Sequence, residues 1–480
     1  MGIQNFKTLS GTDTSIDSAV IEAFRSIIRG SLIAENDAEY EEARRVWNSL
    51  IDKRPALIAR CLGQADVVAA VDFARQNKLL VSVRGGGHNV SGSALCEGGL
   101  TIDLSPMRAV RVDQRSNTVH VQGGATLADV DRETQVFGLA TTTGNVSETG
   151  VAGLTLGGGF GNLRRKYGLS IDNLVSVNVV TADGRVLRAA EDENPDLFWA
   201  LRGGGGNFGV VTSFEFRLHR VGPEVYFAAQ FFSMDHAPQA FRAWRDFMEA
   251  APEDISSLSF FWTVPRVDAF PEEIRGKRVF LYGALHAGDA AKGEQETAVL
   301  RQIGTPILDI SGPGPYCAWQ ASFDPFFARG TVYEEIYAYW KSLYLGGLTD
   351  AHIDELVVTA QGMPTEQCLM AIWHLGGAMA RVPEDATAFG KRNAPYMLSY
   401  DSCWTDPALT ETVIAWTRAQ VAAAQRHASG GLYLNFPGVG ENTEELVREA
   451  YGNNFARLAK IKRRYDPGNL FRINQNIKPQ

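Results

Sequence analysis

Three consecutive glycines followed by a histidine are the first feature that could carry chemistry. Residues 83–89 read Val-Arg-Gly-Gly-Gly-His-Asn and follow directly on Leu79–Val83, an apolar run typical of a short strand. Backbone N–H groups that no side chain covers can surround a diphosphate, so this loop is a candidate phosphate-binding element. His88 would then lie beside the bound group, although a histidine that is merely exposed or hydrogen-bonded is the simpler alternative.

A second glycine-rich segment spans residues 144–161, Gly-Asn-Val-Ser-Glu-Thr-Gly-Val-Ala-Gly-Leu-Thr-Leu-Gly-Gly-Gly-Phe-Gly. Glycine makes up 48 of the 480 residues, or 10% against a usual value of roughly 7%. Of these 48 glycines, 23 lie between Gly85 and Gly209. A segment with so many glycines is too flexible to serve only as structural support. It predicts that the backbone closely approaches a large flat ligand.

A third glycine motif has the wrong neighbours for the ligand it usually indicates. Residues 204–209 satisfy G-x-G-x-x-G, a dinucleotide fingerprint that requires a strand before it and a helix after it. Here a predicted helix, Pro195–Leu201, comes first and a predicted strand, Gly209–His219, follows. The sequence also contains no P-loop, no HExxH and no G-x-S-x-G motif. Rossmann, NTPase and hydrolase interpretations therefore lose their usual support.

The middle of the chain supplies aromatic and histidine candidates. Tyr333, Tyr337, Trp340 and Tyr344 are spaced by four, three and four residues, which predicts one face of a helix. Such a face usually packs into a core, but it could also form a wall of a substrate cavity, because tyrosine offers a flat ring and a hydroxyl. His374 lies in an apolar predicted strand, where a satisfied sheet histidine and a catalytic acid or base are both open.

The helices and strands that position these residues are predicted from alternating patterns in the sequence. Helices are predicted over Ala65–Asn77 and Ala125–Phe137, and a hairpin over Leu174–Ala189. The tail is expected to hold one strand near Leu432 and one helical stretch over Thr443–Arg464. Asn442 resembles the start of that helix, and Gly452 is a candidate break within it. Many short strands mixed with helices indicate an α+β fold rather than an open doubly wound sheet.

Shifts in composition divide the chain. After Pro223 aromatic residues become frequent and glycine thins out. We predict an N-terminal cap over 1–52, a ligand-binding domain over 53–222, a substrate domain over 223–425, and a C-terminal segment over 426–480 that returns to the ligand-binding domain.

Composition and charge limit the partners. The 46 basic and 55 acidic residues give a net charge of −9 without a basic block, which argues against nucleic acid or an anionic membrane as the main partner. No apolar run approaches the roughly 18 residues of a spanning helix, and the first residues lack the apolar core of a signal peptide. The five cysteines are dispersed along the sequence: Cys61, Cys96, Cys317, Cys368 and Cys403. Dispersed cysteines indicate free thiols in a reducing compartment, so we expect a cytoplasmic protein.

Together these motifs resemble the vanillyl-alcohol-oxidase superfamily with its PCMH-type FAD-binding domain. The likeness is carried by residues 84–89, by Leu-Gly-Gly-Gly-Phe-Gly at 156–161 and by Tyr-Gly-Leu-Ser-Ile-Asp-Asn at 167–173. Residues 197–212 and the tail, with Tyr-Leu-Asn at 433–435, resemble the berberine-bridge-enzyme-like branch, nearest to bacterial 6-hydroxynicotine oxidases. Specific family motifs are found in residues 54–220 and 430–480. Between these two ranges the sequence has only a general likeness to the family. It implies a two-lobed fold whose substrate domain has a mixed or antiparallel sheet covered by helices.

The resemblance also implies the cofactor and the site. His88 matches the histidine that bonds covalently to the 8α-methyl of FAD. The catalytic candidates are Tyr433, Asn435, His374 and Tyr333, and no metal is implied. The following residues are implied to contact FAD: Arg84, Gly85, Gly86, Gly87, His88, Asn89, Gly144, Thr149, Gly150, Gly153, Gly157, Gly158, Gly159, Gly161, Asp172, Asn173, Val179, Tyr433, Asn435 and Asn474.

Three departures from the family pattern matter. Relatives with a second covalent link carry a cysteine where this chain has Val146, so attachment through His88 alone is expected. Thr149 stands at the oxygen gate, where it is neither the valine typical of oxidases nor the leucine that tends to block oxygen. Phe436 replaces a tyrosine base that some relatives keep, so a base, if one is needed, must come from elsewhere.

These features lead to an FAD-linked oxidase that takes hydride from a small aromatic amine or alcohol to flavin N5 and passes electrons to O2, forming H2O2. An FAD-dependent dehydrogenase or a carbohydrate oxidase of the same family is the alternative. A second alternative is a protein that binds flavin and a ligand but catalyses no reaction. The expected partners are a small-molecule substrate and molecular oxygen, and the chain is expected to be a monomer or a homodimer.

Overall fold

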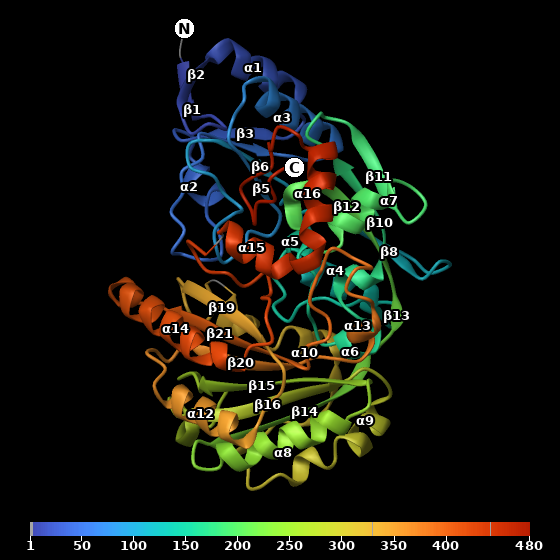
Figure 1. Ribbon diagram of the computed structural model, residues 1–480, viewed down its shortest axis with the longest axis vertical. Coiled ribbons are helices and arrows are strands. Elements are labelled where there is room, and N and C mark those ends of the chain that lie inside the picture. Colours follow the sequence, from blue (N-terminus) through green and yellow to red (C-terminus); the bar gives the residue numbers. More distant parts are fainter. Residues whose placement is uncertain (1–2, 329, 442) are drawn as a thin grey trace.

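The computed structural model describes residues 3–328, 330–441 and 443–480, and the upper part of Figure 1 is formed mainly by the first 220 residues. A four-stranded sheet of order β3-β4-β6-β5 lies here, in which β6 pairs in parallel with β4 and β5. The helix α3 supplies the crossover that parallel pairing requires. The elements are β1 (Ile3–Lys7), β2 (Asp13–Asp17), α1 (Ser18–Ile27), β3 (Ser31–Ala34), α2 (Tyr40–Ala43), β4 (Leu57–Arg60), α3 (Gln64–Gln76), β5 (Val81–Arg84) and β6 (Leu100–Asp103).

A five-stranded antiparallel sheet of order β11-β10-β12-β8-β7 completes this half. The predicted hairpin is present, with β10 paired to β11. The helix α7 coincides with the predicted helix Pro195–Leu201. The elements are β7 (Val110–Asp113), β8 (Thr118–Gln122), α4 (Leu127–Gln135), β9 (Leu139–Ala140), α5 (Val151–Leu156), α6 (Arg164–Tyr167), β10 (Leu174–Val180), β11 (Val186–Ala190), α7 (Pro195–Leu201), β12 (Val210–Arg217) and β13 (His219–Arg220).

The lower part of Figure 1 is an eight-stranded sheet in which every pairing is antiparallel. Its order is β17-β14-β16-β15-β20-β21-β19, with β18 paired to β14. The elements are β14 (Glu224–Ser233), α8 (Ala237–Ala250), β15 (Ile255–Thr263), β16 (Arg278–His286), α9 (Ala290–Glu296), β17 (Leu308–Asp309), β18 (Gly312–Pro315), α10 (Tyr316–Gln320), α11 (Asp324–Phe327), β19 (Tyr337–Leu345), α12 (Asp350–Gln361), β20 (Leu369–His374), α13 (Ala378–Arg381), β21 (Tyr396–Trp404) and α14 (Thr410–Ala424).

The two faces of this sheet bury different residues, because successive side chains of a strand point to opposite sides. Phe261 and Ile372 belong to the core under α8, α12 and α14. Phe260 and Ala371, one position away in each strand, belong to the core that continues into the upper half. The sheet is therefore covered by helices on one face and turns its other face to the first 220 residues.

The C-terminal segment returns to the upper half, where its helices appear in red in Figure 1. The helical stretch is divided at Gly452 into α15 (Glu444–Tyr451) and α16 (Phe455–Tyr465). Thr443 caps α15 by accepting a hydrogen bond from Leu446 N, whereas the predicted start, Asn442, lies outside the described residues. The strand predicted near Leu432 is wrong, because residues 431–438 contain no strand and only residues 434–435 form a turn.

The predicted aromatic helix is also wrong. Tyr337, Trp340 and Tyr344 lie on β19, which pairs with β21 along its whole length. A short aromatic run matches a helical spacing by chance, and pairing with a neighbouring strand decides its conformation. Trp340 therefore faces the inner core while Tyr339, next to it, packs under the helices.

The predicted α+β class, with an antiparallel sheet covered by helices in the second lobe, is confirmed. Among the described residues, we find no helix that is both long and apolar enough to cross a membrane.

Candidate functional site

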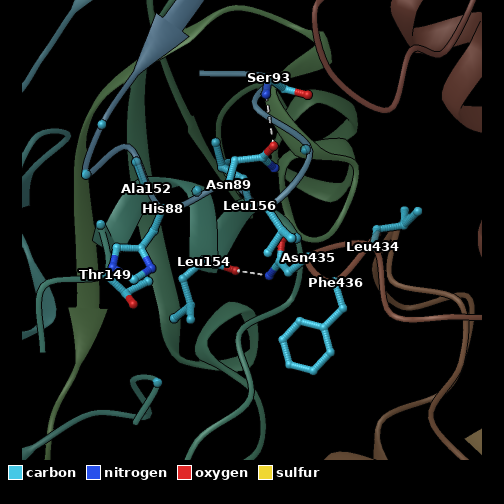
Figure 2. A pocket seen from close by; sticks show the side chains of 18 of the residues that line it. His88, Asn89, Ser93, Thr149, Ala152, Leu154, Leu156, Leu434, Asn435 and Phe436 are labelled. Atoms are coloured by element: carbon cyan, nitrogen blue, oxygen red, sulfur yellow. Dashed lines mark hydrogen bonds between the residues drawn. The ribbon is translucent and has the colours of Figure 1, made fainter. Parts of the chain in front are cut away.

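A cavity of about 300 Å³ lies between the glycine-rich loops of the upper half and the inner face of the eight-stranded sheet. Most of the residues proposed from the sequence meet in it (Figure 2). Those that line the cavity are Gly85, Gly86, Gly87, His88, Asn89, Gly144, Thr149, Gly150, Gly153, Gly157, Tyr433, Asn435 and Asn474. Segments about 350 residues apart in the sequence are thus brought into one wall.

The remaining proposed residues do not line the cavity. Asp172 forms a buried ion pair with Arg392, with Oδ1 2.8 Å from Nη2. Asn173 donates to the carbonyl oxygen of Leu169, 2.9 Å away. The residues outside the lining are Arg84, Gly158, Gly159, Gly161, Asp172, Asn173, Val179, His374 and Tyr333.

The two glycine-rich loops are packed backbone to backbone. A Cβ atom on Gly86 would lie 2.4 Å from Gly150 N, and one on Gly150 would lie 2.3 Å from Gly86 N. Neither position can hold a side chain without moving the other loop. Gly153, in contrast, has no atom within 4 Å of where its Cβ would be, so its open side is cavity space.

Gly158 and Gly159 have a different role from the one expected. A Cβ on Gly158 would meet the Phe389 ring at 2.7 Å, and one on Gly159 would meet Ser170 Oγ at 2.1 Å. Both have positive φ values, +118° and +82°, which only glycine adopts readily. These glycines form a tight turn against neighbouring side chains and do not project into the cavity.

His88 is held on two sides at the cavity wall. Its Nε2 atom lies 2.9 Å from Glu148 Oε1. Its ring stacks on that of Trp47, with centroids 4.8 Å apart and planes inclined by 20°. His88 is thus hydrogen-bonded, as the simpler alternative also requires, and it is held by residues from two other segments of the chain. Neither Trp47 nor Glu148 was identified from the sequence, because their approach depends on the folded chain.

Tyr433 and Asn435 connect the tail to the second glycine-rich segment. Asn435 Nδ2 donates to Leu154 O at 3.0 Å, as Figure 2 shows, and to the Tyr433 hydroxyl at 2.8 Å. Burial raises the pKa of Tyr433 to about 12. Its phenol therefore stays protonated at neutral pH and is poorly suited to act as a base.

An aromatic wall stands opposite the loops. Trp340 contacts Trp47 and Phe436 edge to face, with centroids 5.2 and 5.3 Å away. Trp373 lines the same space. Further lining residues from the sheet and its loops are Leu258, Phe260, Phe323, Phe327, Leu369 and Ala371. Such a wall suits a flat apolar group.

Asp401 interrupts this apolar wall, and sequence inspection missed it. It lies on β21 between Trp340 of β19 and Leu369 of β20, and only 6% of its surface is exposed. Its Oδ1 atom has no hydrogen-bond partner. Burial raises the pKa of its carboxyl to about 7, although a hydrogen bond from Ser399 acts in the opposite direction. The alternation of side chains along a strand is the sequence signal that could have found Asp401, but using it requires knowing which face of the sheet meets the cavity.

His374 and Tyr333 do not reach the cavity. His374 follows Trp373 on β20 and so points to the other side of the sheet. Burial, followed by the charges of Arg165 and Arg164, lowers the pKa of His374 to about 2, so its imidazole is neutral. His374 is thus a histidine on the sheet face away from the cavity, where it cannot act as an acid or base in that cavity, but its buried Nδ1 atom has no hydrogen-bond partner, so it is not the satisfied histidine expected.

Comparison with known proteins relates this cavity to flavin enzymes. A family described as "FAD binding domain" matches residues 55–190, and one described as "Berberine and berberine like" matches residues 432–478. The chain is 31% identical to an FAD-linked oxidoreductase of Dictyostelium discoideum over 463 residues, which cover 96% of this chain and 97% of that protein.

Two solved structures share the fold over almost the whole chain. The crystal structure of 6-hydroxy-D-nicotine oxidase from Arthrobacter nicotinovorans has a TM-score of 0.83 and 29% identity, covering 94% of this chain and 98% of that one. A xylooligosaccharide oxidase from Myceliophthora thermophila C1, in complex with xylobiose, has a TM-score of 0.80 and 25% identity, covering 96% and 99%.

Proposed function

Since this chain belongs to the FAD-linked oxidoreductases of the berberine-bridge-enzyme-like branch, we propose that it oxidises a small aromatic amine or alcohol and passes the electrons to molecular oxygen. FAD dependence comes with the family. The substrate class, the oxidant and the mode of attachment are our proposal.

The cavity fits FAD in its backbone and in its polar atoms. Gly153 and Gly206 line it with no atom within 4 Å of where a Cβ would be, so a cofactor can lie against bare backbone. The side-chain oxygens of Asn145 and Asn474 are buried at the cavity wall without a hydrogen-bond partner. Buried polar atoms are rarely left unpaired, and these two suit the polar edge of a bound group.

When bound, FAD supplies the two-electron chemistry, and the protein supplies placement and charge. The loops at 85–89 and 150–157 would hold the cofactor. His88 and Val146 both line the cavity, and the Val146 side chain offers no thiol for a second link. We propose covalent attachment through His88 alone.

Asp401 is the observation that carries the substrate proposal. It is a carboxyl whose Oδ1 atom has no hydrogen-bond partner, in a wall of tryptophan and phenylalanine rings. Of the described residues that line the cavity, none is a lysine or an arginine. A carboxyl in such a setting can pair with an ammonium group, and aromatic faces attract the same cation. It can equally accept a hydrogen bond from an alcohol.

Proton transfer at Asp401 Oδ1 is what this chain contributes to the reaction itself. An amine carries its positive charge on the nitrogen, and it must lose a proton there before hydride can leave the neighbouring carbon. The ionised carboxyl accepts that proton, or the hydroxyl proton of an alcohol. A sugar would need many polar partners, and this wall offers few of them.

Thr149 supports oxygen as the oxidant. It lines the cavity beside His88 (Figure 2), and its side chain is smaller than the leucine associated with blocked oxygen access. A dehydrogenase would reduce its flavin equally well but would reoxidise slowly in air.

The deciding experiment is flavin reduction under argon with matched panels of aromatic amines, aromatic alcohols and sugars, followed by mixing with air. We expect fast bleaching by aromatic amines or alcohols, then rapid reoxidation with H2O2 release. Bleaching by sugars alone would contradict the substrate class. Slow reoxidation would indicate the dehydrogenase instead, and no bleaching by any panel would support a binding protein.

A further inference from the structure

His88 and Glu148 form an acid–base pair at the cavity wall. The Nε2–Oε1 distance of 2.9 Å is that of a hydrogen bond. The His88 side chain is 12% exposed and that of Glu148 is 36% exposed. Because a carboxylate only accepts hydrogen bonds, the ring nitrogen that faces it, Nε2, carries a hydrogen. Nδ1 is then the ring nitrogen left to act as a nucleophile.

The segment that presents Glu148 is fixed on both sides. Ser147 N donates to Asp324 Oδ1 at 2.7 Å, and Leu127 N donates to Thr149 O at 3.0 Å. The carboxylate is therefore anchored through its neighbours in the chain, so it can define the orientation of the ring it contacts.

Trp47 fixes the plane of the same ring. Its indole stacks on the imidazole, its backbone N donates to Gly87 O at 3.1 Å, and its Nε1 donates to Phe327 O. With one face against Trp47 and one edge on Glu148, the His88 ring has a defined orientation, in which Nε2 faces the carboxylate.

We propose that Glu148 is the positioning residue for covalent FAD attachment and directs the bond to His88 Nδ1. This inference rests on the attachment through His88 put forward above. The bond that forms joins Nδ1 to the flavin 8α-carbon, and the bond that breaks is one C–H of the 8α-methyl. Alkylation at Nδ1 leaves the ring positively charged, and Glu148 accepts the Nε2 proton that restores a neutral ring.

The electron balance requires an oxidant. The electron pair of the broken C–H bond would stay on the flavin and leave it two-electron reduced, while the proton of that bond would pass to water. Dioxygen would accept these two electrons together with two protons, equal in number to those lost from the C–H bond and from Nε2, and form H2O2. Attachment should therefore yield the oxidised, yellow product only in the presence of oxygen.

The test follows attachment and not turnover. Protein produced in flavin-limited cells is incubated with FAD in air, and acid-stable flavin is measured over time. The linkage isomer is then identified on the isolated His88 peptide. In the wild type we expect complete attachment through Nδ1. In Glu148→Ala we expect attachment at least tenfold slower, with a mixture of Nδ1 and Nε2 linkages because neither tautomer is favoured.

Glu148→Gln separates charge from hydrogen bonding. Its side-chain carbonyl can still accept from Nε2–H, so we expect Nδ1 linkage to be retained and the rate to be intermediate. Asp324→Asn keeps a side-chain carbonyl that can accept from Ser147 N and leaves Glu148 unchanged, so it should keep Nδ1 linkage. Glu215→Gln alters a Glu–His pair away from the cavity, where Glu215 Oε1 lies 3.7 Å from His120 Nε2, and should change nothing.

The outcomes are distinguishable. Wild-type rate and pure Nδ1 linkage in Glu148→Ala would overturn the role of Glu148 while leaving covalent attachment intact. Exclusive Nε2 linkage in the wild type would overturn the assigned tautomer. A wild type that releases all its flavin into acid would overturn the attachment itself, whereas oxidation of amines or alcohols would still be measurable on the loosely bound cofactor.

Discussion

The two walls of the cavity are built on different principles. The wall formed by residues 85–89 and 144–157 is largely backbone, and its glycines are close neighbours in the sequence. The opposite wall is made of side chains from β15, β19, β20 and β21, whose contributions come from residues 258 to 401. The first wall would hold the cofactor by backbone contacts, and the second would contact the substrate that approaches the cofactor.

This difference explains why the cofactor is easier to infer than the substrate. A backbone wall needs glycine at fixed positions, and any other residue there leaves the ligand no space. A side-chain wall on a regular sheet can change its chemistry one residue at a time without altering the fold. Asp401 is such a position, because the strand pairing around it is uninterrupted.

The largest expected effect comes from breaking the backbone wall without breaking the fold. Gly153 lies inside α5, where a side chain is compatible with the helix, and its open side is the cavity. In Gly153→Val the added atoms would occupy cofactor space. We expect folded protein with little or no bound flavin, measured by the flavin absorbance per protein and by circular dichroism.

Gly158→Val is the matched control, because it introduces the same side chain outside the cavity. At φ +118° and against Phe389, valine should cost about 1–3 kcal/mol of folding free energy. The melting temperature should fall while the folded fraction still binds flavin. Colourless but fully stable Gly158→Val protein would show that the cavity boundary is misplaced.

A smaller effect is expected from altering the side-chain wall. Asp401→Asn removes the ionisable group but keeps its shape. We expect flavin binding to be unchanged and anaerobic flavin reduction by an aromatic amine to slow by about 100-fold, as for loss of an acid–base group. In the wild type this rate should rise with pH through about 7, where the Asp401 carboxyl ionises, and the rise should be absent in the variant.

His374→Gln provides the comparison for Asp401, since it alters a polar residue on the neighbouring strand but on the opposite face of the sheet. Its reduction rate and pH profile should match the wild type. Equal slowing in both variants would mean that any change in the sheet disturbs the reaction, and Asp401 would lose its assigned role.

The backbone wall was largely predictable from the sequence, because its signals are local. Glycine spacing located the loops around Gly86 and Gly150, and strand patterns placed the elements between them. The exceptions are glycines such as Gly158 and Gly159, which serve a turn. Spacing shows that a side chain is excluded but not which neighbour excludes it.

The side-chain wall was predicted poorly, because its signals are not local. Trp340 was assigned to a helix, since a strand and a helix face can share the same aromatic spacing. Asp401 and Trp47 carry no motif, and they join the site only through strand register and loop packing. Similarly, His374 was a candidate because the sequence does not reveal which face of β20 meets the ligand.

The smallest expected effect compares buried carboxyls at and away from the cavity. Asp131 lies on α4 outside the cavity lining, and burial raises the pKa of its carboxyl to about 7, as it does for Asp401. In the unfolded chain both groups titrate near pH 4. Between about pH 4 and about pH 7 folding takes up protons at both sites, so the free energy of unfolding falls as pH rises and stays lower above that window.

Asp131→Asn and Asp401→Asn should each flatten this fall, by at most about 1.4 kcal/mol per pH unit, in urea unfolding followed from about pH 4 to about pH 9. A non-oxidisable aromatic ammonium ion should separate the two sites. It would pair with the Asp401 carboxylate and recover stability above about pH 7 in the wild type and in Asp131→Asn. In Asp401→Asn it should have no pH-dependent effect. Equal stabilisation of all three proteins would show that the ligand binds without meeting Asp401, because Asp401 is the only carboxyl among the described residues that line the cavity.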